Sequence, residues 1–123
     1  MTIRRIELTE ARDALKECIA ERGEDFVYRK PVGSIRCLYV HHNDDGTNRP
    51  GCGVGMALLK LGVPESAFQG SMNGTPVYDL YLDGFQFTED AMQYLTTFQC
   101  EQDDMTTWGK SLAYADRRAG IED

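Results

Sequence analysis

The residues best suited to chemistry gather in one stretch of the chain, between Cys37 and Gly62. This stretch contains both histidines, His41 and His42, and two of the four cysteines, Cys37 and Cys52. A polar loop and a run of alternating glycines separate the histidines from a short apolar segment. If the chain has a catalytic or metal-binding site, the sequence places it here.

Cys52 is the candidate nucleophile. It directly precedes a predicted helix, where backbone N–H groups and the helix dipole lower the pKa of a thiol. His41 or His42 could serve as its base if the fold brings an imidazole close to the sulfur. The opposing interpretation is that Cys52 is a small buried residue at a tight junction between loop and helix. A small cysteine-dependent enzyme therefore stays open as one alternative.

Cys37, His41 and Cys52 also have the right chemistry for zinc ligands. Their spacing argues against a shared site, because Cys37 and His41 on one straight strand would lie about 13 Å apart, at about 3.3 Å per residue. A bond from zinc to a protein nitrogen is only about 2 Å long. A site would require the strand to end before His41, so we expect no metal.

Three alternating glycines, Gly51, Gly53 and Gly55, invite comparison with loops that bind phosphate at a helix N-terminus. The segment lacks the Gly-Lys-Ser/Thr ending of a P-loop, and its spacing is not the G-x-G-x-x-G of dinucleotide-binding folds. Small residues at such a junction also allow segments of backbone to pack closely. The sequence favours close packing, and we expect no cofactor.

The elements that would position these residues include four to five helices, which apolar periodicity and capping residues predict. Thr9 is the expected first cap, with Gly23 as the stop. The other predicted helices cover 54–61 and 64–68, begin at Thr88, and run from Thr106 or Thr107 to Gly120. Two β-prone runs, 25–28 and 34–41, flank a Pro/Gly loop and predict an antiparallel hairpin.

A chain of 123 residues has the size of one domain. We therefore expect a single small α+β domain over residues 1–123, with an ordered core of about residues 8–119. In it, the short antiparallel β-hairpin packs against the four to five helices. The segment 70–86 shows no clear periodicity.

The net charge of −7 indicates that the chain does not bind nucleic acid directly, because phosphate binding needs a basic face. The N-terminus lacks the apolar core of a signal peptide, and the longest apolar run, Val54–Leu61, is too short to span a bilayer. We therefore expect a cytoplasmic protein with reduced thiols and no membrane contact. No pattern indicates an oligomeric state.

Two groups of charged residues could contact a protein partner. The first shares one face of the predicted first helix, and the second lies in the polar loop before Gly51. Their members are Glu10, Asp13, Glu17 and Glu21 on the helix, and Asp44, Asp45 and Arg49 in the loop. An acidic helix face is usually only solvated, so its use as a contact surface is the more specific of two interpretations.

Several motifs resemble a group of small uncharacterised proteins of actinobacteria and their bacteriophages. They are C-x-Y-V-H from Cys37, P-G-C-x-V-G from Pro50, L-G-V-P from Leu61, Q-x-x-Q-D from Gln99 and T-W-G from Thr107. The resemblance implies an actinobacterial or phage source and an intracellular protein, and it brings no established activity. One departure is Gly53, where the group leads us to expect a bulky aliphatic residue.

These observations predict a small soluble accessory protein that binds a host protein, in the host cytoplasm if a phage encodes it. An acidic surface could instead imitate DNA and act as a decoy of a DNA-binding protein. The third alternative is the cysteine-dependent enzyme that uses Cys52 with His41 or His42.

Overall fold

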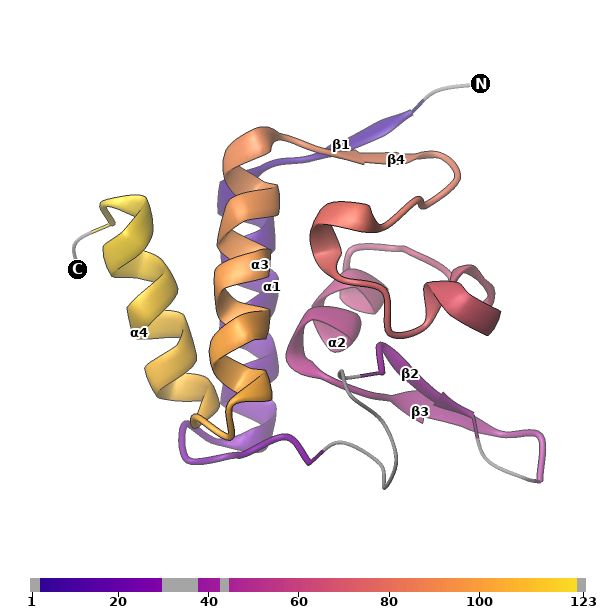
Figure 1. Cartoon of the computed structure of the whole chain (residues 1–123), viewed down its shortest axis with the longest axis horizontal. Coiled ribbons are helices and arrows are strands. Elements are labelled where there is room, and N and C mark those ends of the chain that lie inside the picture. Colours follow the sequence, from indigo (N-terminus) through magenta and orange to yellow (C-terminus); the bar gives the residue numbers. More distant parts are fainter. Residues whose placement is uncertain (1–2, 30–37, 43–44, 122–123) are drawn as a thin grey trace.

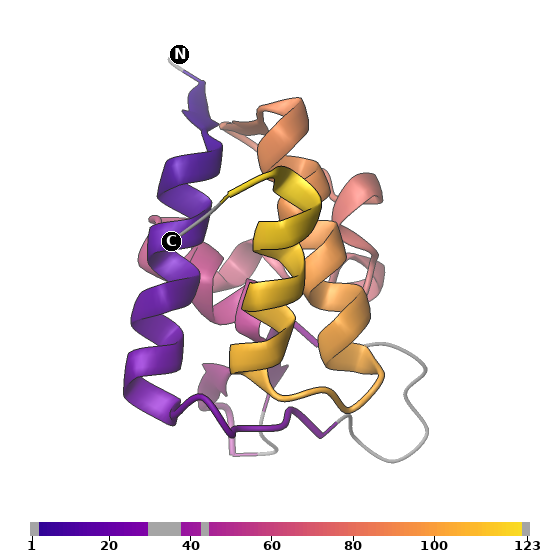
Figure 2. The same ribbon diagram turned by 90° about the vertical axis from the view of Figure 1, so that its left-hand side faces the viewer.

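Helix α3 (Glu89–Asp103) lies at the centre of the molecule, between α4 (Trp108–Ala119) and the segments on the opposite side (Figure 1). Helix α1 (Leu8–Arg22) packs against it and runs in the same direction, whereas α4 runs antiparallel to both (Figure 2). The computed structural model describes residues 3–29, 38–42 and 45–121.

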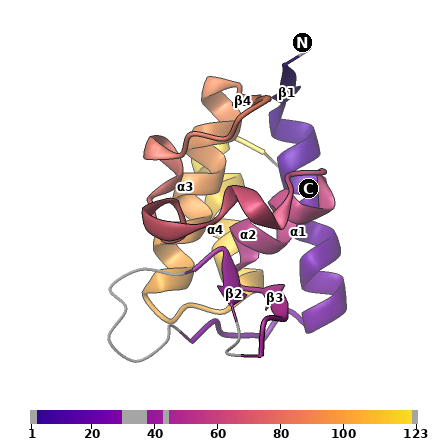
Figure 3. The same cartoon turned by 90° about the vertical axis from the view of Figure 1, so that its right-hand side faces the viewer.

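The side of α3 away from α4 is covered by helix α2 (Gly53–Lys60) and by the irregular segment that follows it (Figure 3). That segment contains three short 3-10 turns, which are η1 (Glu65–Ala67), η2 (Gly70–Met72) and η3 (Val77–Asp79). The predicted helix over 54–61 is thus confirmed. The stretch 70–86, which has no clear periodicity in the sequence, is mostly irregular backbone packed on α3.

Two short strand pairs complete this small α+β domain. Strand β1 (Arg4–Ile6) pairs in parallel with β4 (Phe85–Phe87), and β2 (Val40–His42) pairs antiparallel with β3 (Asn48–Pro50). The parallel pair holds the start of α1 beside the start of α3, because each strand leads directly into one of these helices.

The hairpin predicted between 25–28 and 34–41 is wrong. Residues 26–29 form no strand, residues 30–37 lie outside the described residues, and β2 pairs with β3 instead. The backbone of this segment has another task, because Phe26 and Glu24 accept hydrogen bonds from the N–H groups of Trp108 and Gly109, both at 2.9 Å. These two N–H groups lie in the first turn of α4, where no carbonyl of the helix itself can accept from them.

The helix caps follow the sequence signals at two of three sites. Thr88 and Thr107 cap α3 and α4 by accepting hydrogen bonds from Ala91 N and Lys110 N, at 3.3 Å each. The first cap is wrong, because α1 begins at Leu8 and its cap is Glu7 rather than Thr9. Strand β1 ends one residue before that cap, which moves the helix start towards the N-terminus.

The core lies where α1, α2 and α3 meet. Its largest fully buried side chains are Trp108, Tyr39, Tyr94, Phe68 and Phe98. The rings pack in pairs: Phe26 meets Trp108 edge to face with centroids 4.5 Å apart, and Tyr39 stacks on Phe68 at 5.1 Å.

A partly buried ion pair joins the three long helices. The Arg12 guanidinium of α1 donates to both carboxylate oxygens of Asp116 in α4, at 2.9 and 3.1 Å, and the Tyr94 hydroxyl of α3 donates to the same carboxylate. Burial alone would raise the pKa of Asp116. The hydrogen bonds from Arg12 and Tyr94 and the charge of Arg12 outweigh burial and lower this pKa.

Replacing Asp116→Asn should therefore lower the free energy of unfolding by about 3 kcal/mol at pH 7, because it removes the carboxylate charge that the Arg12 guanidinium and the Tyr94 hydroxyl bind. The folded-state pKa of Asp116 is lowered, so this stabilisation is present above the unfolded pKa of about 3.9 and is lost as the pH falls through the folded value. Urea titrations of both proteins at pH 7 and pH 3 test this, and the difference should shrink at pH 3. The exposed Asp13→Asn is the control, and an equal effect of both substitutions would contradict the assignment.

Candidate functional site

The described residues of the stretch that the sequence singles out pack tightly where the end of β3 leads into α2 beside the β2 segment. We call this junction the joint. The N–H groups of Gly51 and Cys52 donate to the carbonyls of Tyr39 and Leu38, both at 2.9 Å, so the chain continues beside the β2 segment after β3 ends. Cys52 then caps α2, and its side chain is fully buried. The joint therefore brings loop, strand and helix together without exposing the thiol.

The glycines allow this packing. A Cβ at Gly55 would lie 2.1 Å from the Tyr39 carbonyl oxygen, and one at Gly51 would lie 1.9 Å from the Leu38 carbonyl oxygen. At Gly53 a Cβ would lie 2.6 Å from the Phe98 ring. Close packing, as the sequence favoured, accounts for all three residues. The bulky residue expected at position 53 would have to displace the Phe98 ring.

Two amide side chains of α3 connect the joint to the core. Gln102 is fully buried, and its Oε1 accepts a hydrogen bond from Gly53 N at 2.7 Å. Gln99 accepts from Val77 N at 3.2 Å and donates to the Tyr39 hydroxyl at 2.9 Å. The first N–H of α2, which an anion would need, is thus bound to Gln102.

Asn73, in the irregular segment, binds the backbone where β2 begins. Its Oδ1 accepts hydrogen bonds from Tyr39 N and Val40 N, at 2.8 and 3.2 Å, and its Nδ2 donates to Val40 O at 2.8 Å. Sequence reasoning missed Asn73 because an asparagine in an irregular segment has no spacing that predicts which backbone groups it will bind.

The two histidines have separate environments. His41 Nε2 lies 2.9 Å from the Tyr28 hydroxyl, which also accepts a hydrogen bond from Leu38 N at 3.0 Å. His42 has Nδ1 2.8 Å from Asn48 Oδ1 and Nε2 2.9 Å from the Phe68 carbonyl. Among the described residues no hydrogen bond joins the Cys52 sulfur to either imidazole.

The described residues contain no group of three or more His, Cys, Asp or Glu side chains that could hold a metal ion. Cys37, one of the weighed ligands, lies outside them. His41 and Cys52 are the two weighed zinc ligands that the structure describes, and the Cys52 side chain is fully buried.

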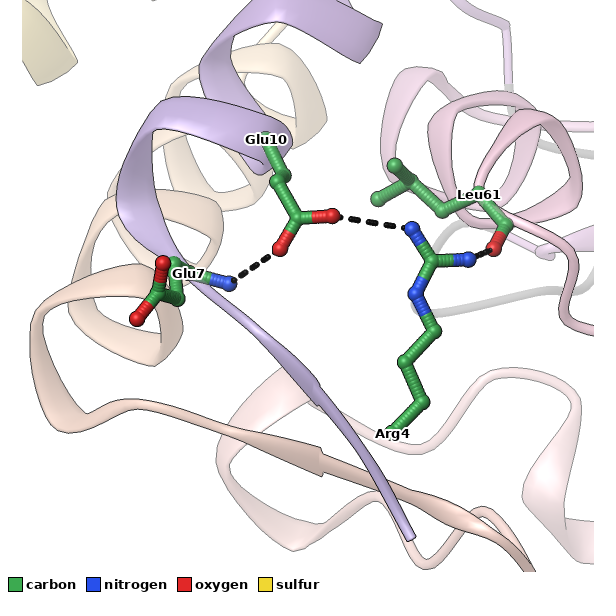
Figure 4. Close-up of polar contacts among 4 residues, drawn as sticks. All are labelled: Arg4, Glu7, Glu10 and Leu61. Carbon is green, nitrogen blue, oxygen red and sulfur yellow. Dashed lines mark hydrogen bonds and ion pairs between the residues drawn. The ribbon is translucent and has the colours of Figure 1, made fainter. Parts of the chain in front are cut away.

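The acidic face of α1 is partly neutralised within the chain. Arg4 donates to Glu10 at 2.8 Å and also to the Leu61 carbonyl, while Glu10 accepts from Glu7 N at 3.2 Å (Figure 4). The hydrogen bond from Arg4 is the largest cause of a lowered pKa at Glu10. At the other end of the face, Glu21 pairs with Lys60 at 2.6 Å.

The remaining predicted contact residues are less constrained. Asp13 and Glu17 are exposed and have no hydrogen bond or ion pair to any described residue. In the loop, Asp45 accepts hydrogen bonds from the backbone and the hydroxyl of Thr47, at 3.0 and 2.6 Å. Asp44 lies outside the described residues, and Arg49 pairs with His41 in the β2–β3 ladder.

The surface also has features that sequence reasoning did not select. A hollow of about 360 Å³ lies over the outer face of α4, where Lys110, Tyr114 and Arg117 repeat at helical spacing. This face is opposite the side of α4 that is buried through Trp108, Ser111 and Ala115. A larger hollow of about 490 Å³ is lined by residues of α3 and α4 and by Tyr78. Met92 and Tyr94, which both line it, lie on opposite sides of α3, so the hollow is not confined to one face of that helix.

No protein-family model matches the chain, and no curated protein or solved structure matches it at a significant level. Within the part of the chain that the structure describes, no helix has both the length and the apolar composition needed to cross a bilayer.

The glycine joint makes a prediction about stability. Gly55→Ala should lower the free energy of unfolding by about 2–3 kcal/mol, because the new methyl meets backbone that must shift. Gly53→Ala should cost less, because its nearest obstacle is the edge of a ring that can tilt. Thermal and urea unfolding of both variants measure the order, and a Gly55→Ala variant as stable as the parent would refute the packing role.

His42 gives a prediction about pH. The Phe68 carbonyl and the Asn48 side chain raise its pKa above the usual 6.5, because both oxygens accept from a protonated ring. The contribution of His42 to stability is thus complete below about pH 6.5 and is lost as the pH rises through the folded-state pKa. An NMR titration of the ring should show the raised pKa, and His42→Gln should destabilise more at pH 5.5 than at pH 8.5. A titration midpoint at or below 6.5 would count against these hydrogen bonds.

Proposed function

We propose that this chain is a small accessory protein that acts by binding another protein through the acidic face of α1. Asp13 and Glu17 carry the proposal, because they are exposed, adjacent on the helix and not paired with any described residue. The opposite face of α1 is buried through Ala11, Leu15 and Cys18, so the helix offers its charges from a fixed position. A partner with a basic patch would complement this face.

The resemblance to small actinobacterial and phage proteins supports a host protein as the partner and the host cytoplasm as the place. The same resemblance supports a source in an actinobacterium or one of its phages. The decoy alternative uses the same face, since a row of carboxylates can imitate DNA phosphates towards a DNA-binding protein.

The burial of Cys52 weighs against the enzyme alternative. A nucleophile must reach its substrate, and the Cys52 side chain is fully enclosed by the joint. Neither imidazole is hydrogen-bonded to it among the described residues. The enzyme alternative therefore requires a rearrangement at the start of α2, and we do not propose it.

Charge reversal tests the binding face. The variant Asp13→Lys/Glu17→Lys should lose at least about tenfold in captured host protein, because like charges then face the partner's basic patch. Pull-down from a host lysate with quantitative mass spectrometry measures the loss. Raising the salt from 50 to 200 mM should weaken capture by the parent, since exposed charges are screened.

The control variant Asp79→Lys/Asp83→Lys makes the same change in net charge on the irregular segment, at two exposed residues away from α1. It should retain its partner. Equal capture by the parent and both variants would contradict the proposal, and displacement of the partner by duplex DNA would favour the decoy.

A further inference from the structure

The outer face of α4 is chemically unlike the rest of this acidic chain. A hollow of about 360 Å³ lies over it, and we call its lining the α4 face. The lining residues are Glu101, Thr106, Lys110, Ala113, Tyr114 and Arg117. Lys110, Tyr114 and Arg117 are four and three residues apart, so they share one side of the helix, opposite the buried Trp108 and Ala115. The face therefore combines two cations and an aromatic ring.

Arg117 is prepared to bind a carboxylate. Its Cζ lies 5.7 Å from the centre of the Tyr114 ring, in cation–π contact. Its side chain makes no hydrogen bond or ion pair with any described residue. This contact engages the cation and not the N–H donors of the planar guanidinium, which can hold both oxygens of a carboxylate.

Lys110 adds a second unpaired charge on the same side. Its ammonium has no ion pair with a described residue. Glu101 also lines the hollow but forms no ion pair with Lys110 or Arg117. The two cations are therefore available to an external acid, and Glu101 opposes that acid by its charge.

The turn that leads into α4 provides an independent observation. Met105 has φ of 66°, in the left-handed region, and its side chain is 49% exposed. Its N–H donates to Gln102 O and the next N–H donates to Glu101 O, at 3.1 and 3.3 Å, which is the helix ending that normally places glycine at this position. Met105 itself does not line the hollow, but it directly precedes Thr106, which does, so an exposed and adaptable apolar side chain lies next to the α4 face in the chain.

From these contacts we infer that the α4 face binds an acidic segment of a partner protein, one with an apolar residue among its carboxylates. The carboxylates pair with Arg117 and Lys110, and the apolar residue meets Tyr114 and Met105. Duplex nucleic acid fits less well, because its affinity depends on many phosphate contacts and this chain carries a net charge of −7. This site does not depend on the α1 face, which calls for a basic partner.

Fluorescence anisotropy with a defined probe tests the inference. The probe is a fluorescein-labelled peptide of glutamates that flank a central Leu-Phe pair, and the same peptide with glutamines is the neutral control. The glutamate peptide should bind the full chain, and the glutamine peptide should bind at least about tenfold more weakly, as expected for the loss of one or two charge-assisted hydrogen bonds.

Variants then locate the site. Lys110→Glu/Arg117→Glu should raise the Kd at least about tenfold. Arg5→Glu/Arg29→Glu, which changes the net charge equally at exposed residues elsewhere, should leave the Kd within about twofold. Glu101→Gln should tighten binding, because it removes the opposing charge. Met105→Gly should weaken binding while raising Tm, since glycine relieves the left-handed strain.

Each remaining outcome overturns the inference. Equal binding of the glutamine peptide would remove the carboxylates from recognition, and an unchanged Kd in Lys110→Glu/Arg117→Glu would place the site elsewhere. Tighter binding of a 12-base-pair duplex than of the glutamate peptide would assign the face to nucleic acid. Self-association of the unlabelled chain that the same double variant abolishes would assign it to a second copy. Because the assay uses no lysate, its failure leaves the α1 proposal intact.

Discussion

The hydrogen bond from Gly53 N to the buried Gln102 is the contact on which the arrangement of this fold depends. It joins the first N–H of α2 to the last turn of α3, across 49 residues of chain. A buried, unsatisfied N–H or amide would cost about 1–3 kcal/mol, so each group requires the other. Gln99 extends the connection by binding Val77 N and the Tyr39 hydroxyl. Helix α3 thus fixes the positions of α2, the β2 segment and η3 at once, through two side chains one helical turn apart.

This dependence explains why the residue types between Cys37 and Gly62 predict a reactive site, whereas the described residues of this stretch serve close packing. Close backbone approach requires glycine, and the space left at the junction suits a small residue such as Cys52. The same features, small residues before a helix with histidines nearby, also define nucleophile and phosphate sites. Composition and spacing cannot separate the two cases, because the difference lies in which distant side chain, here Gln102, occupies the helix N-terminus.

The helices were predictable because their signals are local. Thr88 and Thr107 cap the helices that the periodicity predicts, and α2 covers nearly the predicted span. The strand pairing was not predictable, because β1 pairs with β4, which is distant in the sequence. The backbone of residues 24–26 forms no strand and instead accepts hydrogen bonds from the start of α4. Glu7 replaced Thr9 as a cap for a similar reason, because β1 fixes where α1 starts. Among the candidate contact residues, the sequence placed Asp13 and Glu17 correctly on an exposed face but could not show that Arg4 and Lys60 neutralise Glu10 and Glu21.

Some charged side chains form ion pairs within the chain, and the others are left for a partner protein to contact. Three ion pairs neutralise charges of both signs within the structure. They are Arg12–Asp116, Arg4–Glu10 and Lys60–Glu21. On α1 the exposed carboxylates Asp13 and Glu17 share one face, with the exposed Lys16 and Arg22 elsewhere on the helix, and on α4 the exposed charges Lys110 and Arg117 are positive. At physiological salt, charges interact over only about 8 Å, so a partner responds to the face it meets rather than to the net charge. Our two proposals therefore assign two different partner surfaces to faces of opposite sign on neighbouring helices, which the Arg12–Asp116 pair joins directly.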